Sequence, residues 1–323
     1  MSKIEWTEKT WNPIRGCSRI SRGCEHCYAE RMAARFSGMC GDPSKPRDTT
    51  APFFTFIDDR GRWTGRVELI ESKLEEPLHW RKPSMVFVNS MSDLLHENLP
   101  DTDIFKVLDV IAGCRRHTFQ VLTKRASRLP EVMDRYYAKL QQETQAAIDQ
   151  ASWEGREQPW EPSVPLENLW LGVSCENQKT ADERIPLLLQ TPAAVRFVSL
   201  EPLLGPVDLN KYLDGHEEHG IDLSRPVGSR VGCCIGWTPP LDWVIVGGES
   251  GPGARPMNLL WARSIVAQCK AAGTPVFVKQ LGSFWARKEN RNPEQWEQIN
   301  GKGGDPSDWP EDLRVREMPG GKP

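Results

Sequence analysis

The chain has 323 residues, the length of about two average domains or of a single α/β barrel. Its 41 Lys and Arg and 44 Asp and Glu residues give a net charge of −3, which disfavours a protein held to nucleic acid by bulk positive charge. No apolar run reaches the roughly 20 residues that span a bilayer, and residues 1–6 lack the apolar core of a signal peptide, so we expect a cytoplasmic protein without membrane contact.

Short apolar runs recur along the chain, with segments of helical spacing between them. Two front strands are predicted near residues 11–14 and at residues 66–70. Six further runs are continuously apolar, as in strands that are buried on both faces of a parallel sheet: residues 85–88, 119–122, 169–173, 195–198, 243–246 and 275–278. The predicted helices are residues 104–114, 126–148, 180–189 and 259–272.

The alternation of strand and helix predicts βα units around a parallel sheet. Eight strands favour an α/β fold of the TIM type, a complete or partial (β/α) barrel with parallel strands, long loop insertions and an irregular C-terminal tail. An open doubly wound sheet is the alternative.

Three stretches interrupt this alternation and are rich in Pro, Gly or charge: residues 38–64, 141–165 and 206–240. We interpret them as insertions in one barrel domain, residues 1–282, that is followed by a C-terminal extension, residues 283–323. The third insertion is long and precedes the strand that leads to Glu249. We therefore expect it to be a lid or a substrate-recognition element.

Three of the nine cysteines form the sharpest motif of the chain. Cys17, Cys24 and Cys27 lie within eleven residues in the pattern Cys-x6-Cys-x2-Cys, after a short strand and before a helix. Loops of six and two residues allow three sulfurs to converge on one metal centre. The surrounding loop is rich in Arg, Ser and Gly, so it is too polar to bury three thiols as ordinary core residues.

Two kinds of metal centre compete for these cysteines. A structural zinc site needs a fourth ligand, and His26 is badly placed for this role inside the two-residue loop. A [4Fe–4S] cluster with three protein ligands leaves one iron free to bind a small molecule. The motif therefore favours the cluster, and zinc is the alternative.

The three-cysteine motif at the front of a βα barrel resembles the radical S-adenosylmethionine (SAM) superfamily, in which the free iron chelates the amino and carboxylate groups of SAM. The commonest spacing there is Cys-x3-Cys-x2-Cys with an aromatic residue before the third Cys, whereas here the first gap is six and that residue is His26. More closely, the chain resembles an uncharacterised phage-protein family with a three-cysteine motif. The segments that carry this resemblance are residues 6–7, 11–13, 16–17, 23–24, 27–30, 247–251 and 309–316.

The resemblance implies an enzyme that binds a [4Fe–4S] cluster and cleaves SAM to a 5′-deoxyadenosyl radical, which abstracts hydrogen from a substrate. It also implies an electron donor such as a flavodoxin or ferredoxin. A phage-type family points by association to a nucleotide or nucleic acid as substrate, and a partner protein that presents the substrate is a further option. The competing class is a non-enzymatic, zinc-binding phage-type protein that binds a nucleic acid or protein partner.

Polar residues follow the predicted strands, at the ends where barrel enzymes place their sites. Loop composition alone explains part of this pattern, but a charge at the mouth of a barrel needs a partner or a ligand. Gly247-Gly248-Glu249 also resembles the glycine-glycine-glutamate element that contacts the methionyl amine in radical-SAM enzymes, although here it follows a late strand. The candidate SAM-binding residues are Asn89, Ser92, Lys124, Ser174, Glu176, Asn177, Glu201, Gly247, Gly248, Glu249 and Lys279.

Two further groups of residues are weaker candidates. His216, His219, Cys233 and Cys234 have the donor types of a zinc site, but adjacent cysteines seldom reach one ion together, so solvated loop residues are the preferred interpretation. Cys175 directly follows a strand and is a candidate to face the site, where it would relay a radical.

Overall fold

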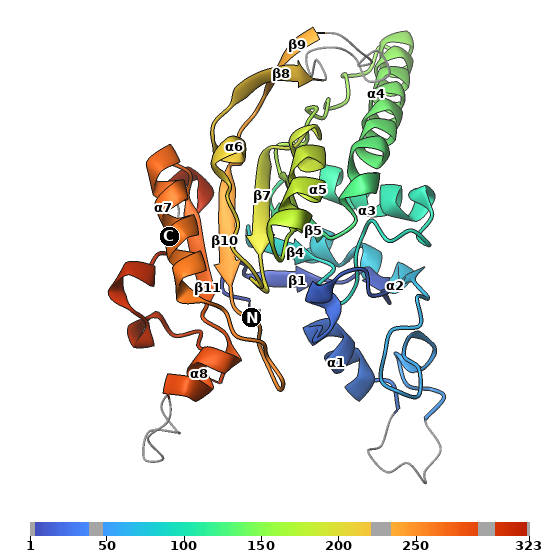
Figure 1. The fold of residues 1–323 in the computed structure, drawn as a ribbon. Coiled ribbons are helices and arrows are strands. Elements are labelled where there is room, and N and C mark those ends of the chain that lie inside the picture. Colours follow the sequence, from blue (N-terminus) through green and yellow to red (C-terminus); the bar gives the residue numbers. More distant parts are fainter. Residues whose placement is uncertain (1–3, 39–47, 221–233, 290–300, 322–323) are drawn as a thin grey trace.

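A computed structural model describes residues 4–38, 48–289 without 221–233, and 301–321 (Figure 1). Seven strands form one sheet in the order β1-β4-β5-β6-β7-β10-β11, and every neighbouring pair is parallel. The strands are β1 (Lys9–Trp11), β4 (Met85–Val88), β5 (Thr118–Thr123), β6 (Leu169–Ser174), β7 (Val195–Leu200), β10 (Trp243–Gly247) and β11 (Val276–Gln280).

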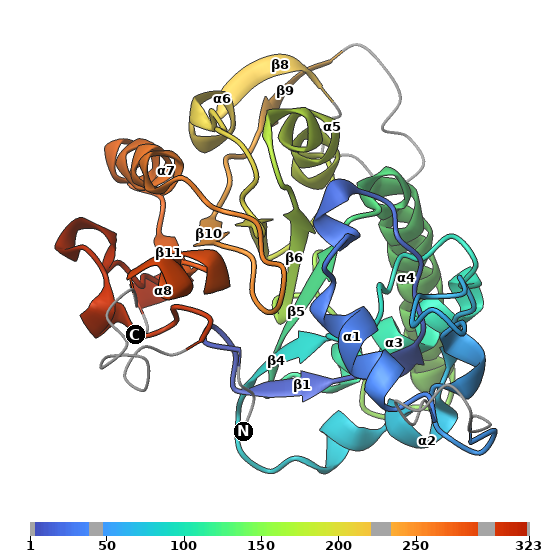
Figure 2. The ribbon, with the colours of Figure 1, turned by 60° about the horizontal axis from the view of Figure 1, so that its bottom comes forward.

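The sheet curves into a half-barrel that is flanked by helices (Figures 1 and 2). All six apolar runs predicted as strands belong to it. The first front strand, predicted near residues 11–14, overlaps the sheet only at Trp11, where β1 ends, and Ile14 belongs to β2 outside this sheet. The barrel is not complete, because the two edge strands, β1 and β11, do not pair with each other within the described residues. The α/β class and the partial barrel are therefore confirmed.

The second predicted front strand does not belong to the barrel. In residues 66–70 only β3 (Glu68–Leu69) is a strand, and it pairs antiparallel with β2 (Ile14–Arg15) outside the main sheet. Val67 and Leu69 pack against the core from this short ladder. These two residues are therefore apolar because they cover the core, and not because they belong to a barrel strand.

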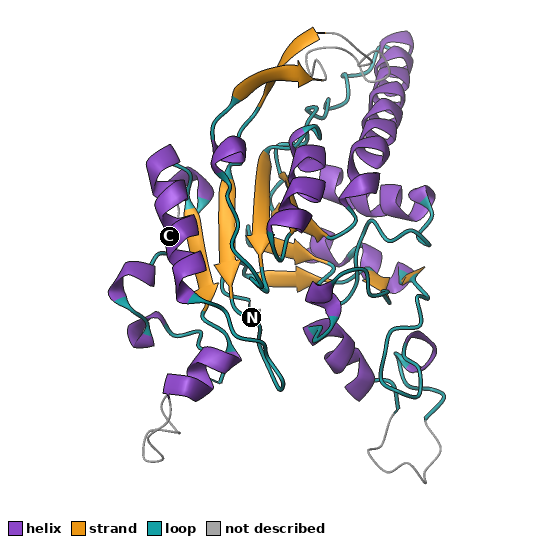
Figure 3. Cartoon of the chain, viewed as in Figure 1, coloured by secondary structure: helices purple, strands orange, loops and turns teal. Residues whose placement is uncertain are grey.

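Long helices cover the convex side of the sheet (Figure 3). They are α3 (Asp101–Gly113), α4 (Leu129–Trp153), α5 (Gln178–Leu189) and α7 (Leu259–Ala272), at the predicted places. The shorter helices are α1 (Tyr28–Arg35), α2 (Glu71–Leu74), α6 (Asn210–Leu213) and α8 (Ser283–Glu289). No helix in the described part of the chain combines the length and the apolarity needed to cross a membrane.

The insertion predicted at residues 141–165 is wrong in its first half. Helix α4 continues to Trp153, because residues 141–153 are mainly Gln, Ala, Glu and Asp with neither Gly nor Pro. Most of these residue types are compatible with a helix that is exposed to solvent. Such a helix needs no apolar face where it extends beyond the elements that pack against it. Of the insertion at residues 38–64, residue 38 and residues 48–64 are described, and Phe53 packs against Phe36 at the end of α1.

The third insertion, residues 206–240, carries an antiparallel ribbon of β8 (His216–Gly220) and β9 (Cys234–Thr238). Figure 1 shows this ribbon beyond the end at which β10 begins, opposite the end to which the strand arrows point. The ribbon is therefore not placed as a lid, because the chain must return to the amino end of the sheet before β10 can run parallel to β7, and the ribbon extends from that return. A role of the insertion in substrate recognition stays a prediction, since residues 221–233 lie outside the described residues. The side chains of His216, His219 and Cys234, and Cys233 entirely, lie outside the described residues.

The C-terminal extension is irregular after α8, with short 3-10 turns at Pro306–Asp308, Glu311–Leu313 and Pro319–Gly321. It nevertheless packs on the core, because Trp309 and Leu313 are buried. Val278 N donates to Val315 O at 2.9 Å, so the extension covers the free edge of β11.

The concave face of the half-barrel is apolar at one end and polar at the other. A cluster of Trp6, Phe197, Trp243, Ile245 and Phe277 fills the end at which the strands begin. Strand side chains alternate between faces, so the next inward positions toward the carboxyl ends are Ser199, Gly247 and Lys279. On the concave face, polar side chains therefore follow the apolar cluster toward the carboxyl ends of these strands.

Candidate functional site

Cys17, Cys24 and Cys27 lie on one loop, residues 16–27, which we call the cysteine loop. It connects β2 to α1, which lies at the side of the sheet to which the strand arrows point (Figure 1). The loop begins at Gly16, whose φ is +93° and whose Cβ position would lie 2.0 Å from Arg66 O, so only glycine fits there. The predicted motif is thus at the carboxyl ends of the strands, as expected for a barrel enzyme.

The three thiols are free and half-buried. Burial raises the pKa of Cys17 to about 12, and the charges of Asp93, Cys27 and Cys24 add to this effect. Burial also raises the pKa of Cys27, although the charge of Lys124 opposes it. Cys17 and Cys27 are therefore protonated on their own, and ligand binding would require them to release protons.

The donor set fits an iron–sulfur cluster in number and kind. Within the described residues, no three His, Cys, Asp or Glu side chains are arranged to hold one metal ion. One ion needs all its donors within about 2.3 Å of a single point, whereas each Cys ligand of a four-iron cluster binds a different iron. Three thiols, with the Arg125 guanidinium beside Cys17, would supply the Cys ligands and the positive charge that such a cluster needs.

A first contact to the loop comes from the ends of β4 and β5. The Arg125 guanidinium donates to Ser18 Oγ at 2.7 Å and to Asp93 Oδ2 at 3.0 Å. It also pairs with Glu97 at 2.5 Å. These bonds connect the residue after Cys17 to two strand ends.

A second contact comes from Glu176, at the end of β6. Its side chain is 1% exposed, accepts a hydrogen bond from Ser21 Oγ and pairs with Arg184 at 3.2 Å. Gly23 lies against it, since a Cβ there would approach Glu176 Oε1 to 2.3 Å. Burial opposes ionisation of Glu176, but the charge of Lys124 and the bond from Ser21 hold its pKa below the usual range.

A third contact comes from Glu249, at the end of β10. His26 Nδ1 donates to Glu249 Oε2 at 3.0 Å, and Arg255 Nη2 donates to Oε1 at 2.6 Å. Arg255 Nη1 also pairs with Glu25 at 2.7 Å, within the cysteine loop. Burial opposes ionisation of Glu249, but hydrogen bonds from Arg255 and His26 outweigh it and lower the pKa.

Four of the predicted residues meet on the concave face, and we call them the polar ledge. Lys124 Nζ donates to Ser174 Oγ at 2.6 Å, and Ser174 Oγ donates to Glu201 O at 3.2 Å. Lys279 Nζ pairs with Glu201 at 2.7 Å. Within the described residues Lys124 forms no ion pair with a carboxylate, although its charge lowers the pKa of Glu176, so it is a candidate partner for an anionic ligand.

The remaining predicted residues support the backbone. Asn89 Oδ1 accepts from Ile14 N at 3.2 Å, and Ser92 Oγ donates to Ile14 O at 3.0 Å, so both fix the strand that leads into the cysteine loop. Asn177 caps α5 through a hydrogen bond from Thr180 N at 3.1 Å.

The two glycines of the Gly247-Gly248-Glu249 element have steric roles. A Cβ on Gly248 would lie 2.4 Å from Leu281 O, so a larger residue would push the backbone apart there. A Cβ on Gly247 would lie 3.3 Å from the Glu201 side chain, so this position also keeps space beside the polar ledge.

Cys175 does not face this site, contrary to the sequence-based expectation. It is fully buried in the core under α5, and its thiol donates to Thr180 O at 3.5 Å. Burial raises its pKa to about 12. Side chains alternate along a strand, so the neighbours Ser174 and Glu176 point the other way.

Sequence reasoning missed the partners of the predicted residues, namely Ser18, Asp93, Arg125, Arg184 and Arg255. Arg125 directly follows Lys124, and Asp93 closes the polar run after β4, so their places after strands were the available clue. Arg255 had no such clue because it lies beyond the strand end, in the loop after Glu249.

The ion pair between Arg125 and Glu97 predicts that the stability of the fold depends on pH. Burial opposes ionisation of Glu97, but hydrogen bonds from Arg125 and from its own backbone lower its pKa from 4.5 to about 2. Ionised Glu97 therefore stabilises the fold above pH 4.5, and this contribution is lost as the pH falls toward 2. We expect Glu97→Gln to lower the free energy of unfolding at pH 6 by less than about 1 kcal/mol, since the carboxylate is solvent-screened.

Urea unfolding of the cluster-free protein at pH 6 and at pH 3 measures this difference. Glu143→Gln is the control, since Glu143 pairs only with Lys139 on the surface of α4 within the described residues. An effect of Glu97→Gln that is equal at both pH values would contradict the prediction.

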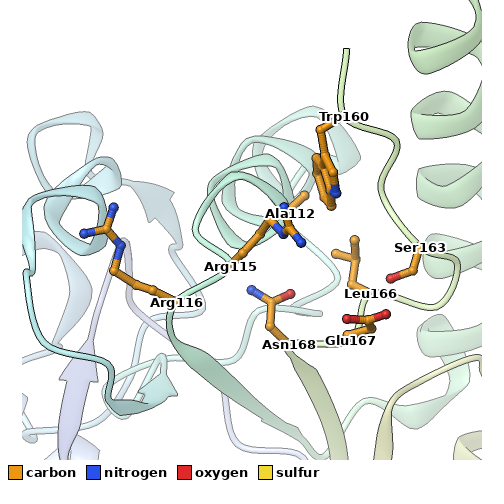
Figure 4. Close-up of a pocket in the computed structure, with 8 residues that line it drawn as sticks. All are labelled: Ala112, Arg115, Arg116, Trp160, Ser163, Leu166, Glu167 and Asn168. Carbon is orange, nitrogen blue, oxygen red and sulfur yellow. The ribbon is translucent and has the colours of Figure 1, made fainter. Parts of the chain in front are cut away.

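A pocket of about 290 Å³ lies elsewhere, beside the start of β6 (Figure 4). Arg115 stacks over the Trp160 ring at 4.4 Å there, and Leu166, Glu167 and Asn168 line the wall. None of the predicted site residues contributes to it. The candidate site therefore remains the cysteine loop and the polar ledge.

Comparison with known proteins gives a family and no function. No curated protein and no solved structure is significantly similar to the chain. Residues 1–309 match a family described as a protein of unknown function, DUF5131. This match confirms the expectation of an uncharacterised family, and the chain belongs to DUF5131.

Proposed function

We propose that this protein is a radical-SAM-type enzyme, which binds a [4Fe–4S] cluster through Cys17, Cys24 and Cys27. When bound, the cluster supplies the electron that cleaves SAM to a 5′-deoxyadenosyl radical. The observation that carries the proposal is the position of the three cysteines on one loop, at the carboxyl ends of a parallel half-barrel. In such folds that end is where cofactors and substrates bind.

The residues around the loop supply rigidity and charge. Arg125, Glu176 and Glu249 each connect the loop to a different strand end, so the three thiols are held by the sheet and not by the loop alone. Rigid support of this kind preorganises a site before the ligand arrives.

The polar ledge is the proposed place for SAM. Lys124 offers a positive charge to a carboxylate, and Glu201, although paired with Lys279, offers carboxylate oxygens to hydroxyl or ammonium groups. The aromatic cluster around Trp243 closes the concave face below, which would exclude water from one side of a radical.

The partners follow from the same proposal. An electron donor such as a flavodoxin or ferredoxin would reduce the cluster, and the substrate would be a nucleotide or nucleic acid, free or presented by a partner protein. A nucleic-acid substrate requires a local basic surface, because the net charge of the chain is −3.

The test is anaerobic purification and reconstitution, followed by incubation with SAM and a reductant. We expect a brown protein that releases 5′-deoxyadenosine, at a rate that rises when the true substrate among nucleosides, DNA, tRNA or peptides is present. A colourless protein with stoichiometric zinc would contradict the proposal and support the non-enzymatic alternative.

A further inference from the structure

Arg125 uses every N–H of its guanidinium, and one of them is directed at a cysteine of the motif. Nε donates to Glu97 at 2.5 Å, and Nη2 donates to Ser18 Oγ at 2.7 Å and to Ser18 O at 3.2 Å. Nη1 donates to Asp93 at 3.0 Å and to Cys17 Sγ at 3.9 Å. The Arg125 side chain is 5% exposed, so its bonds to Asp93, Ser18 and Cys17 are shielded from water, whereas Glu97 is 57% exposed.

The acceptors of Arg125 are themselves fixed. Asp93 Oδ1 accepts from Thr123 Oγ1 at 2.7 Å, and Asp93 Oδ2 accepts from Lys124 N at 3.1 Å. His96 Nδ1 accepts from Asn98 N at 3.1 Å, so its Nε2 carries the proton and donates to Ser18 Oγ at 2.9 Å. These fixed acceptors hold the guanidinium in one orientation, in which Nη1 points at Cys17 Sγ.

We propose that Arg125 is a positioning residue that holds Cys17 as a ligand and raises the reduction potential of the bound cluster. This inference rests on the proposed function. Reduction adds negative charge to a cluster, and a hydrogen bond to a ligand sulfur stabilises that charge. The charge of Arg125 is largely balanced by Asp93 and Glu97, so the N–H···S bond is the main contribution.

Lysine cannot replace this arrangement. Its ammonium places three donors at one point, whereas the planar guanidinium reaches Asp93, Ser18 and Cys17 in different directions. Arg125→Lys thus keeps the positive charge but cannot make the hydrogen bonds to Asp93, Ser18 and Cys17 at the same time. Arg125→Met loses both and leaves Asp93 as a buried, unpaired carboxylate.

The experiment is a redox titration of the reconstituted wild type, Arg125→Lys and Arg125→Met, followed by electron paramagnetic resonance. We expect both variants to have more negative potentials than the wild type, with the larger shift in Arg125→Met. Arg125→Met/Asp93→Asn separates the two effects, because it restores the charge balance without the hydrogen bond. A shift that persists in this double variant supports the bond to sulfur.

Arg128→Met is the matched control. Arg128 lies three residues further along, and its guanidinium pairs with Asp101 and with backbone carbonyls, without a bond to the cysteine loop within the described residues. The cluster of the Arg128→Met variant should have the same reduction potential as the cluster of the wild type.

Amide hydrogen exchange of the cluster-free protein tests positioning independently of the cluster. Peptides that cover residues 16–20 should exchange about tenfold faster in Arg125→Lys, because bonds to Ser18 are lost. Loss of the cluster in both variants, with faster exchange, would also support the positioning role. Wild-type potential and exchange in Arg125→Lys would overturn the inference, whereas a wild type without iron would overturn the proposed function instead.

Discussion

Replacement of Cys17, Cys24 or Cys27 by alanine should abolish iron binding. The reconstituted wild type should hold about four irons per chain, the content of one [4Fe–4S] cluster. Each of the three thiols is a candidate ligand, and the loop has no further cysteine that could take the place of one that is removed. We expect each single variant to fall from about four irons to near zero.

Cys114→Ala is the matched control for the three variants. Cys114 is buried at the end of α3, where its thiol donates to Pro77 O at 3.4 Å, and it has no contact with the cysteine loop within the described residues. Iron analysis and the visible absorbance spectrum of all four proteins decide the result. A full cluster in Cys24→Ala would contradict the assignment of the motif.

The barrel strands could be predicted because they are covered on both faces. A strand such as Trp243–Gly247 has no polar side, so a continuous apolar run identifies it without an alignment. The same criterion failed at residues 66–70, where Val67 and Leu69 cover the core from outside the barrel. Apolar character reports burial, and burial occurs outside sheets as well.

The place of the third insertion could not be predicted from its length. A long connection between parallel strands passes both ends of the sheet, and sequence alone does not tell at which end the extra residues extend. The structure puts the β8–β9 ribbon at the amino end of β10, far along the connection from β7 (Figure 1). This placement removes the structural basis for a role as a lid over the cysteine loop.

The gathering of polar residues at the strand ends could be predicted, but the partners of the charged residues among them could not. Glu176 and Glu249 could be identified as candidates because they follow the apolar runs that predict strands. The partner of Glu249, His26, lies 223 residues away in the sequence, and no local pattern reports such a contact. The structure therefore changes the expected role of both carboxylates, from candidate contacts of SAM to supports of the cysteine loop.

This division of roles predicts different defects for residues that the sequence placed in one group. Lys124→Met should keep the cluster and lower the affinity for SAM at least about tenfold, because it removes a charge that no carboxylate pairs with in the described residues. Glu249→Gln should instead reduce cluster content, because Arg255 and His26 lose their shared carboxylate.

Equilibrium binding of SAM and iron analysis of the same preparations separate the two defects. Lys139→Met is the control for loss of a lysine, since Lys139 pairs with Asp109 and Glu143 on the outside of α4. If Lys124→Met binds SAM as the wild type does, the polar ledge is not the SAM site. If Glu249→Gln retains iron but loses SAM, Glu249 contacts SAM directly, and its bonds to Arg255 and His26 must rearrange when the ligand enters.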